Sequence, residues 1–350
     1  MKISFLGDIS LNDSYNELYK KGLKPFHDIS KTIKGSDYII GNLESAVKGN
    51  EDGINPLKSP HLSTSLNTLN YLKDINIDMV CLANNHIYDY LEDGYNKTIN
   101  FLDQNNIKYI GTQGLRSNVQ ELDGIKFCFL NYVANDTNPY FPKDCKINVF
   151  DKEQVIDDIK QYRKSVDQII ILLHWGGKTE NGYYPDLKQS MNARTFIDNG
   201  ADLIIGHHSH TFQPFECYKG KYIFYSLGNF CFSDIYQDNK LYCKLSKRQK
   251  ESIILEVDFK KNKEYSMDMI PIKNIGCYII KSDNSFQHTK FHIRNFVFKI
   301  LKRSNILWKI YFFKLKKINP ILNYLFIQRG SLKNALTYNK ILKYLEINKY

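Results

Sequence analysis

The sequence places three of its nine histidines within four residues. His207, His208 and His210 follow a short apolar run, Asp202–Ile205, that ends in Gly206. Such a run predicts a buried strand that delivers the histidine loop at its carboxyl end. Imidazole nitrogens two residues apart on a loop can converge on one divalent transition metal. An isolated pair of this kind is equally typical of a hydrogen-bonded histidine cluster, so the rest of the chain decides.

Four more apolar runs lead to residues that could do chemistry. The runs are Lys2–Leu6, Tyr38–Ile40, Asp78–Leu82 and Ile169–Leu173. They are followed in turn by Asp8, by Glu44, by Asn85 with His86, and by His174. Because the carboxyl ends of parallel strands share one edge of a sheet, we expect these side chains to gather there.

Carboxylate, carboxamide and imidazole groups from successive strands can hold two divalent ions about 3.5–4 Å apart. Such ions lower the pKa of water and offset charge on a phosphoryl or carbonyl oxygen under attack. A carboxylate is needed to bridge the ions, and we predict Glu44 for that role. Asn85 offers a neutral oxygen ligand, which leaves His86 free to donate a proton or a hydrogen bond to the substrate.

Helical patterns lie between the predicted strands. Apolar residues recur at spacings of three and four in Ser65–Lys73, Glu92–Gln104, Lys152–Arg163 and Asp186–Asp198. Alternating strands and helices predict a largely parallel sheet covered by helices. Turn signals at Leu122–Ile125 and Tyr218–Lys221 predict two hairpins, and alternating stretches at Ile253–Phe259 and Tyr265–Ile272 predict a further β portion.

The positive charge of the chain is concentrated in its tail. Residues 289–350 hold 14 of the 48 Lys and Arg residues and one acid, Glu346, which gives +13 there and −2 for residues 1–288. Apolar and basic residues alternate around Trp308, which predicts a basic amphipathic helix suited to an anionic membrane surface. The alternatives are packing on the catalytic domain or docking to a partner protein, a synthase complex or an acidic polymer. Nucleic-acid binding is not indicated, since no recognition motif accompanies the charge.

Seven widely spaced cysteines without a CxxC pair indicate neither a disulfide framework nor a zinc knuckle. Reduced thiols, the absence of a signal-peptide core after Met1 and the absence of a long uncharged apolar run predict a cytoplasmic protein, peripheral at most to the inner face of the membrane.

Six motifs occur in a fixed order within about residues 2–235. They are Gly7-Asp8, Gly41-Asn42-Leu43-Glu44, Leu82-Ala83-Asn84-Asn85-His86 with Asp89, His174-Trp175-Gly176, Gly206-His207-His208-Ser209-His210 and Tyr225-Ser226-Leu227-Gly228-Asn229-Phe230. In these motifs the chain closely resembles the bacterial poly-gamma-glutamate synthesis (CapA) family, a branch of the calcineurin-like metallophosphoesterase superfamily.

The resemblance implies an α/β fold, a four-layer α/β/β/α metallophosphatase-like sandwich, which we assign to residues 1–285. The pattern of charge and apolar residues, which lies beyond the resemblance, predicts a basic helical C-terminal tail in residues 286–350. It implies one or two divalent ions of the Mn, Fe or Zn type. By analogy the metal ligands are Asp8, Glu44, Asn85, His174, His208 and His210. The catalytic residues are His86 and Asp89. Residues expected beside the substrate or behind the ligands are Asn42, His207, Trp175, Glu180, Tyr184 and Asn229.

Some positions depart from the wider superfamily. Ser10 stands where an imidazole ligand is usual, and the histidine loop is one residue longer, so that either His207 or His208 pairs with His210. The segment Lys178–Tyr184 differs from the pattern of the family, which indicates a different substrate specificity. Trp175 either stacks on a substrate or is simply packed.

Three functions are compatible with these features. The first is a metal-dependent hydrolase of a phosphoester or amide-type bond in production of a capsule or other surface polymer. The second is a non-enzymatic, polymer-binding accessory subunit of a membrane-bound capsule synthase. The third is a cytosolic small-molecule phosphoesterase. Expected partners are an anionic polymer or a phosphorylated or amide substrate.

Overall fold

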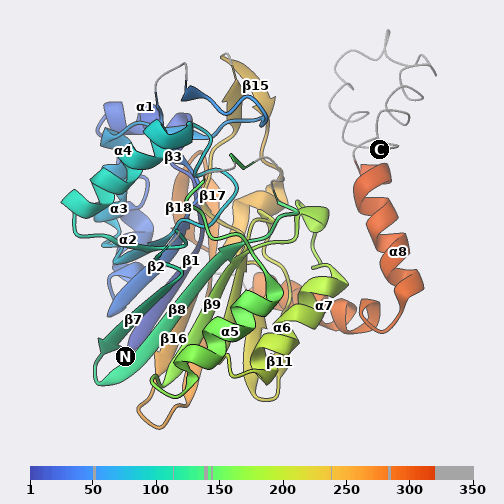
Figure 1. The fold of residues 1–350 in the computed structure, drawn as a ribbon. Helices are drawn as coiled ribbons and strands as arrows, with labels where there is room; N and C mark the ends of the chain where they lie inside the picture. The colour runs from blue at the N-terminus through green and yellow to red at the C-terminus, as the bar shows by residue number, and fades with distance from the viewer. Residues whose placement is uncertain are drawn as a thin grey trace. The chain divides into compact units, whose positions relative to one another are not determined.

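The computed structural model describes residues 1–49, 53–112, 114–137, 141–142, 145–237, 239–282 and 285–319, without the side chains of 285–288. The chain divides into two compact units between Asn295 and Phe296. Figure 1 shows the elements of the first unit, in which helices lie on either side of extended β-sheets.

The first sheet joins strands from both ends of the first unit. Its order is β18-β17-β16-β1-β2-β5-β6, with β13 paired to β1. The pairings among β1, β2, β5, β6 and β13 are parallel, and those of β16, β17 and β18 are antiparallel. The strands are β1 (Lys2–Ile9), β2 (Tyr38–Leu43), β5 (Met79–Cys81), β6 (Lys108–Ile110), β13 (Asn229–Cys231), β16 (Glu251–Phe259), β17 (Tyr265–Ile275) and β18 (Tyr278–Lys281).

The second sheet has the order β11-β12-β10-β9-β8-β7. Its central pairings are parallel, and each edge strand is antiparallel to its neighbour, so both predicted hairpins are confirmed. The strands are β7 (Ser117–Leu122), β8 (Ile125–Val133), β9 (Gln168–His174), β10 (Leu203–His207), β11 (Phe215–Tyr218) and β12 (Lys221–Phe224).

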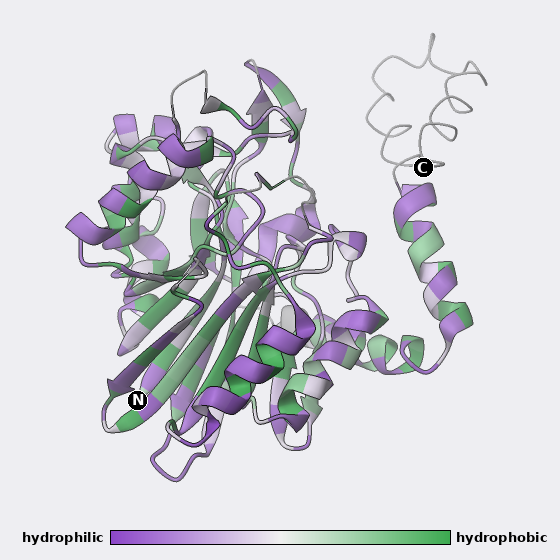
Figure 2. Cartoon of the chain, in the orientation of Figure 1, coloured by the Kyte–Doolittle hydropathy of each residue, from purple (hydrophilic) through white to green (hydrophobic). Residues whose placement is uncertain are grey.

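The two sheets pack face to face because successive residues of a strand point to opposite faces, and both faces of the central strands are apolar. Ile3 and Phe5 of β1 lie in one buried cluster with Phe129 of β8 and Leu172 of β9. Figure 2 shows hydrophobic residues along the strands and hydrophilic residues on much of the helical surface.

Helices cover the outer face of each sheet (Figure 1). On the first sheet α1 to α4 share a buried cluster with β1 and β2, and α5 contacts β9 of the second sheet and lies beside α6. The predicted four-layer sandwich is therefore confirmed. The helices are α1 (Ser14–Lys20), α2 (His27–Ile33), α3 (Tyr71–Asp74), α4 (Leu91–Gln104), α5 (Lys152–Arg163) and α6 (Leu187–Asp198).

One predicted helix is wrong. Instead of a helix over Ser65–Lys73, the chain forms a 3₁₀ helix, Asn67–Asn70, followed by the single turn of α3. The Asn70 side chain donates to the Asn67 carbonyl at 2.8 Å, a local bond that competes with helix formation. The remaining short elements are β3 (Ala46–Val47), β4 (Ser63–Thr64), β14 (Ile235–Gln237), β15 (Lys240–Cys243) and 3₁₀ helices at Gly177–Thr179 and Lys247–Lys250.

The described part of the tail is helical, as predicted, but it is not one helix. Helix α7 (Ser285–Leu301) ends before Ser304, whose hydroxyl accepts the Leu307 N–H and caps α8 (Asn305–Phe313). A π-helical turn, Lys314–Ile318, follows. The predicted tail beyond residue 319 lies outside the described residues. Within the described chain no helix is long and apolar enough to cross a membrane.

Two glycines let the strand ends approach one another closely. A Cβ on Gly7 would lie 1.9 Å from the Gly228 carbonyl oxygen, and a Cβ on Gly206 would lie 1.9 Å from that of Tyr225. Any larger residue would push β1 away from β13 or β10 away from the segment after β12. These glycines therefore allow Asp8 and the histidine loop to reach one region of the domain.

Candidate metal centre

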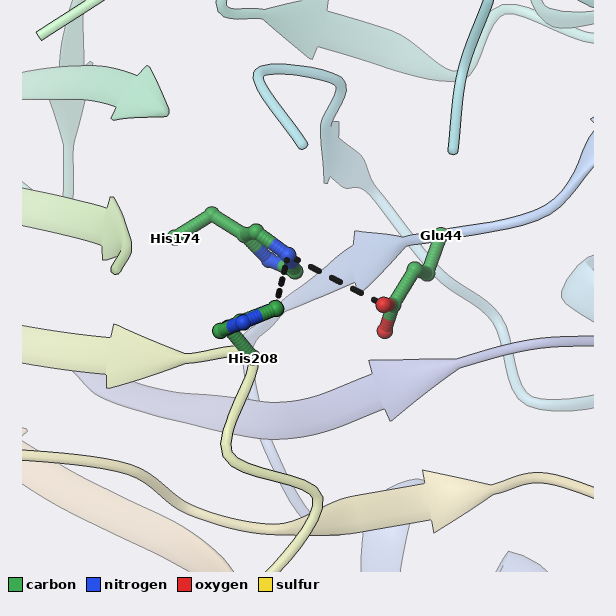
Figure 3. Close-up of side chains that lie close together, drawn as sticks. All are labelled: Glu44, His174 and His208. Carbon is green, nitrogen blue, oxygen red and sulfur yellow. Dashed lines mark hydrogen bonds and ion pairs between the residues drawn. The ribbon is translucent and has the colours of Figure 1, made fainter. Parts of the chain in front are cut away.

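The carboxyl ends of β1, β2, β9 and β10 bring four of the predicted ligand regions together between the two sheets. Glu44, His174 and His208 form one group in which one ligand atom of each residue lies within 4.8 Å of the others. His174 Nε2 lies 3.8 Å from Glu44 Oε1 and 3.1 Å from His208 Nδ1 (Figure 3). This spacing suits one small cation among three donors.

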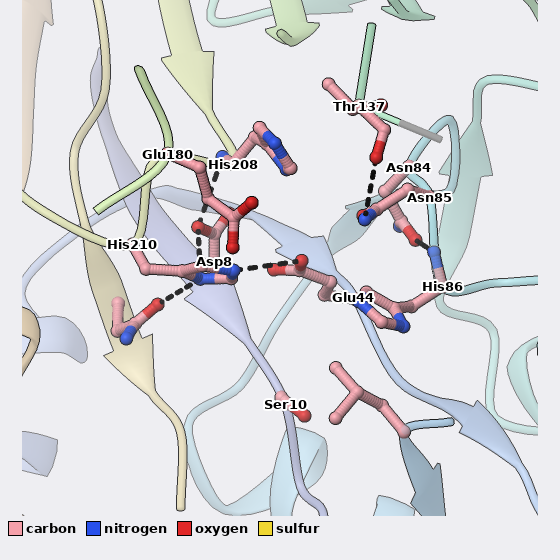
Figure 4. Close-up of polar contacts among 12 residues, drawn as sticks. Asp8, Ser10, Glu44, Asn84, Asn85, His86, Thr137, Glu180, His208 and His210 are labelled. Carbon is pink, nitrogen blue, oxygen red and sulfur yellow. Dashed lines mark hydrogen bonds and ion pairs between the residues drawn. The ribbon is translucent and has the colours of Figure 1, made fainter. Parts of the chain in front are cut away.

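A second group shares the same glutamate. Asp8, Glu44 and His210 also place one ligand atom each within 4.8 Å of one another. His210 lies 3.6 Å from Asp8 through Nδ1 and 3.8 Å from Glu44 through Nε2 (Figure 4). Glu44 is thus common to two candidate sites, which is the position that a bridging carboxylate occupies.

Glu44 is the electrostatic anomaly of the centre. Its side chain is 0% exposed, and neither carboxylate oxygen has a hydrogen-bond partner among the described residues. Burial and the nearby Asp8 carboxylate raise the pKa of Glu44 well above its usual range. A buried, unpaired carboxylate is costly unless a cation compensates it. The donor set therefore fits a divalent ion, because carboxylate and imidazole are its common ligands.

Amide side chains orient the two histidines. Asn42 Nδ2 donates to Asp8 Oδ1 at 2.8 Å and lies 3.3 Å from His174 Nδ1. His210 Nδ1 lies 2.9 Å from Asn229 Oδ1, which can accept its proton and leave Nε2 on the Glu44 side. Hydrogen bonds of this kind fix ring orientation at metal centres.

Asn85 joins the first group through His174. Its Oδ1 lies 2.8 Å from His174 Nε2, close to where the three donors of that group converge. Burial and the neighbouring histidines lower the pKa of His174 well below its usual range, so the ring is neutral and able to ligate. The structure thus brings all six predicted ligands into one region.

The longer histidine loop places His208, rather than His207, in the cluster. His207 Nε2 lies 3.3 Å from the Leu6 carbonyl oxygen and faces β1. His208 and His210 both have positive φ angles, 89° and 55°. Non-glycine residues adopt this conformation rarely, and it turns two histidines of one short loop toward the same region.

His86 and Asp89 form a buried pair beside the cluster. The carboxylate Oδ2 lies 2.7 Å from His86 Nδ1. Burial lowers the pKa of His86 to about 4. Burial alone would raise the pKa of Asp89, but the neighbouring His86 and Lys58 outweigh this effect and lower it. An ionised Asp89 accepts a hydrogen bond from Nδ1–H, so Nε2 of the neutral ring is an acceptor.

The other predicted residues divide into neighbours and packed side chains. Glu180 lies near Glu44 and His210 (Figure 4). Trp175 stacks on Tyr225 and donates its indole N–H to the Tyr225 carbonyl at 3.0 Å, which is the packed alternative. Tyr184 lies by Arg294 and Tyr183. Ser10 donates to Asn12 at 2.8 Å and supplies no substitute for an imidazole.

Two further residues shape the centre: Asn84 lies in a predicted motif but had no assigned role, and Lys58 carries no pattern that sequence reasoning could have used. Asn84 Oδ1 accepts the backbone N–H groups of His86 and Ile87, both at 3.0 Å, and shapes that loop. Lys58 forms an ion pair of 2.9 Å with Asp89, and its side chain is only 8% exposed. A lysine in a loop normally indicates a solvated surface.

The comparisons with known proteins agree with this geometry. The family described as "Bacterial capsule synthesis protein PGA_cap" matches residues 2–234. The chain belongs to this family. It is 28% identical over 322 residues to the PGA biosynthesis protein CapA of Bacillus subtilis, covering 89% of this chain and 80% of that protein. It is also 28% identical to the capsule biosynthesis protein CapA of Bacillus anthracis, covering 78% of this chain and 67% of that protein.

Two solved structures share the fold of this family member. A novel phosphatase from Mycoplasma pneumoniae has a TM-score of 0.51 at 13% identity, over 82% of this chain and 96% of that one. A hypothetical protein from Thermus thermophilus has a TM-score of 0.50 at 14% identity, over 81% of this chain and all of that one. At these identities the likeness concerns the fold alone.

The raised pKa of Glu44 predicts an unusual pH dependence for chelator-treated protein. When folding raises the pKa of a carboxyl group, the protein loses stability as the pH rises above the pKa of that group in the unfolded chain, near 4.5. The loss is about 1.4 kcal/mol per pKa unit. Glu44→Gln removes this charge, so its melting temperature should exceed that of the wild type at pH 8, with the difference shrinking toward pH 5. The exposed Glu121→Gln is the control. A Glu44→Gln protein that is less stable at pH 8 would contradict this prediction.

Proposed function

We propose that the protein is a metal-dependent hydrolase that acts in production of a capsule or other surface polymer, at a phosphoester or amide-type bond. The observation that carries this proposal is Glu44, a buried carboxylate without a hydrogen-bond partner among the described residues, shared by two groups of ligand atoms. Membership of the capsule synthesis family supports the polymer context. The names of the CapA relatives, capsule and PGA biosynthesis, support it as well.

The proposed ligands are Glu44 with His174, His208 and Asn85 for one ion, and Glu44 with Asp8 and His210 for the other. When bound, divalent ions supply positive charge for a phosphoryl or carbonyl oxygen and lower the pKa of water. Manganese, iron and zinc all suit this donor set. His86 Nε2 accepts a proton from a reacting group, while Asp89 holds the ring in position.

Two arginines beside the segment Lys178–Tyr184, whose Glu180 lies near Glu44, support an anionic substrate. The guanidinium groups of Arg248 and Arg294 lie 5.4 and 4.2 Å from the ring centre of Tyr183. Gln249 next to Arg248 donates to Asn181 at 2.7 Å, within the segment Lys178–Tyr184. These contacts hold the arginines beside that segment, and guanidinium groups bind carboxylate and phosphate groups of the kind that an anionic polymer carries.

Metal content tests the two proposed sites separately. We expect two ions per chain by mass spectrometry after loading with Mn²⁺ and removal of excess metal. His210→Ala and His174→Ala each remove a ligand of one group, so each variant should keep about one ion. Glu44→Gln affects both groups and should weaken both sites.

His207→Gln is the matched control, because His207 faces the Leu6 carbonyl rather than the proposed ions, and it should keep two. Two bound ions per chain in the Glu44→Gln protein, or no bound ion in the wild type, would contradict the assignment of Glu44 to both sites.

Substrate assays separate the hydrolase from its alternatives. The metal-loaded protein should shorten poly-gamma-glutamate or a phosphodiester surface polymer, as measured by size-exclusion chromatography. His86→Ala should lower the rate by about 10²–10⁴-fold, which is the usual contribution of a general acid or base. Turnover of small phosphoesters alone would favour the small-molecule phosphoesterase. A metal-loaded protein without turnover on any of these would favour the non-enzymatic accessory subunit.

We propose in addition that the tail binds an anionic membrane surface. On α8, Ile306, Ile310 and Phe313 follow helical spacing and are 72%, 60% and 60% exposed. Residues 285–319 contain nine Lys and Arg residues and no acid. Exposed apolar side chains on a basic helix are typical of interfacial binding. Trp308 and Leu315 in the same segment are buried.

Vesicle sedimentation measures this binding. The full chain should bind vesicles that contain phosphatidylglycerol more strongly than vesicles of phosphatidylcholine, and salt should weaken the binding. Replacing Ile306, Ile310 and Phe313 by Ser should lower the bound fraction at least several-fold. Met191→Ser, an exposed apolar residue elsewhere, is the control. Equal binding by the triple variant and the wild type would refute the proposal.

A further inference from the structure

Lys58 is buried beside the catalytic pair and belongs to no motif of the chain. Its side chain is 8% exposed, and its ammonium lies 2.9 Å from Asp89 Oδ1. The other carboxylate oxygen of Asp89 accepts His86 Nδ1–H at 2.7 Å. Lys58, Asp89 and His86 therefore form a continuous chain of contacts that ends at the His86 ring.

The loop that carries Lys58 is folded around Asp89. The Asn55 N–H donates to the Asp89 carbonyl at 3.0 Å, and the Leu62 N–H donates to Asp89 Oδ2 at 2.6 Å. Together with the ammonium, residues 55–62 contact Asp89 at three points. The lysine is thus held in place by backbone bonds on both sides, unlike a mobile surface side chain.

Charge explains why a cation is needed at this point. Asp89 is fully buried, and its charge is felt by Glu44, which also lies near Asp8 and Glu180. Several carboxylates in one low-dielectric region repel one another, and the outcome is protonation of some of them. A protonated Asp89 would be a poorer acceptor for His86 Nδ1–H. An ammonium in an ion pair of 2.9 Å with Asp89 Oδ1 favours the charged form of this carboxylate.

We infer that Lys58 is a positioning residue of the centre, which holds Asp89 as a charged acceptor so that His86 carries its proton on Nδ1 and presents Nε2 to the substrate. The inference rests on the proposed function for its catalytic meaning. The contacts among the three residues stand without it. Lys58 acts through Asp89 and needs no contact with the reacting atoms.

The tautomer of His86 provides a direct readout. In protein labelled with ¹⁵N-histidine, His86→Gln assigns the His86 signals among the nine histidines. Chelator-treated and Zn²⁺-loaded samples are both measured, so that the readout does not depend on metal binding. We expect the wild type to show a protonated Nδ1 and an unprotonated Nε2. In Lys58→Met this pattern should be lost, and in Lys58→Arg, which keeps the charge, it should return.

Lys24→Met is the matched control, because Lys24 pairs with Asp74 at 3.1 Å on the surface. It should change neither the His86 signals nor the melting temperature. If Lys58→Met does not fold, Lys58→Gln, which keeps a polar side chain but removes the charge, takes its place. It should also lose the wild-type His86 pattern while Asp89 is still present, and an unchanged pattern would overturn the inference.

The result that overturns the inference is a Lys58→Met protein whose His86 signals match those of the wild type. The metal content of this variant should stay at the wild-type value, since Lys58 is not a ligand. If turnover is found, Lys58→Met should lower kcat at least tenfold with little change in KM, and Lys58→Arg should recover most of it. A wild type that binds no metal refutes the proposed function but leaves the tautomer test intact.

Discussion

The structure depends on one unfavourable burial, that of Glu44 between the two sheets. The carboxylate is fully buried, has no hydrogen-bond partner among the described residues and lies close to a second carboxylate, Asp8. His174 and His210 each lie 3.8 Å from it, but His174 is neutral at ordinary pH and cannot compensate its charge. A folded protein tolerates a buried, charged carboxylate when a bound cation compensates its charge. A divalent ion brings more than one positive charge to a single point.

The packing of the two sheets brings the carboxyl ends of four strands close together. Asp8 and Glu44 come from neighbouring parallel strands of the first sheet, and His174 and His208 from neighbouring parallel strands of the second. Each sheet alone carries half of a ligand set, and the face-to-face packing completes it. Gly7 and Gly206 permit the close approach of the segments around these ends, because a Cβ at either position would collide with a backbone carbonyl oxygen.

Much of this could be predicted from the sequence, because long apolar runs predict buried strands and their ends fix where the polar residues lie. The runs before Asp8, Glu44, His174 and His208 are strands, and α4, α5 and α6 begin and end within one residue of their predicted limits. Spacing alone left His207 and His208 as alternatives. The choice depends on positive φ angles in the loop, which the spacing of the residues does not show.

Other features of the structure could not be predicted from the sequence pattern. Residues Ser65–Lys73 have helical spacing, yet the chain forms a 3₁₀ helix and a single α-helical turn there, with the Asn70 side chain bonded to the Asn67 carbonyl. The tail is divided by the Ser304 cap, which a continuous apolar pattern conceals. Lys58 becomes significant only through tertiary contacts with Asp89, because its burial depends on a loop with no periodicity. Long-range packing thus decides details that local preferences leave open.

The measurement that tests the central claim most directly is an anomalous difference map from crystals of the Mn²⁺-loaded protein. The account predicts two manganese peaks about 3.5–4 Å apart with the Glu44 carboxylate between them. One peak should lie toward His174 and His208, and the other toward Asp8 and His210. A map without peaks at Glu44, or with manganese bound only elsewhere on the chain, would contradict it.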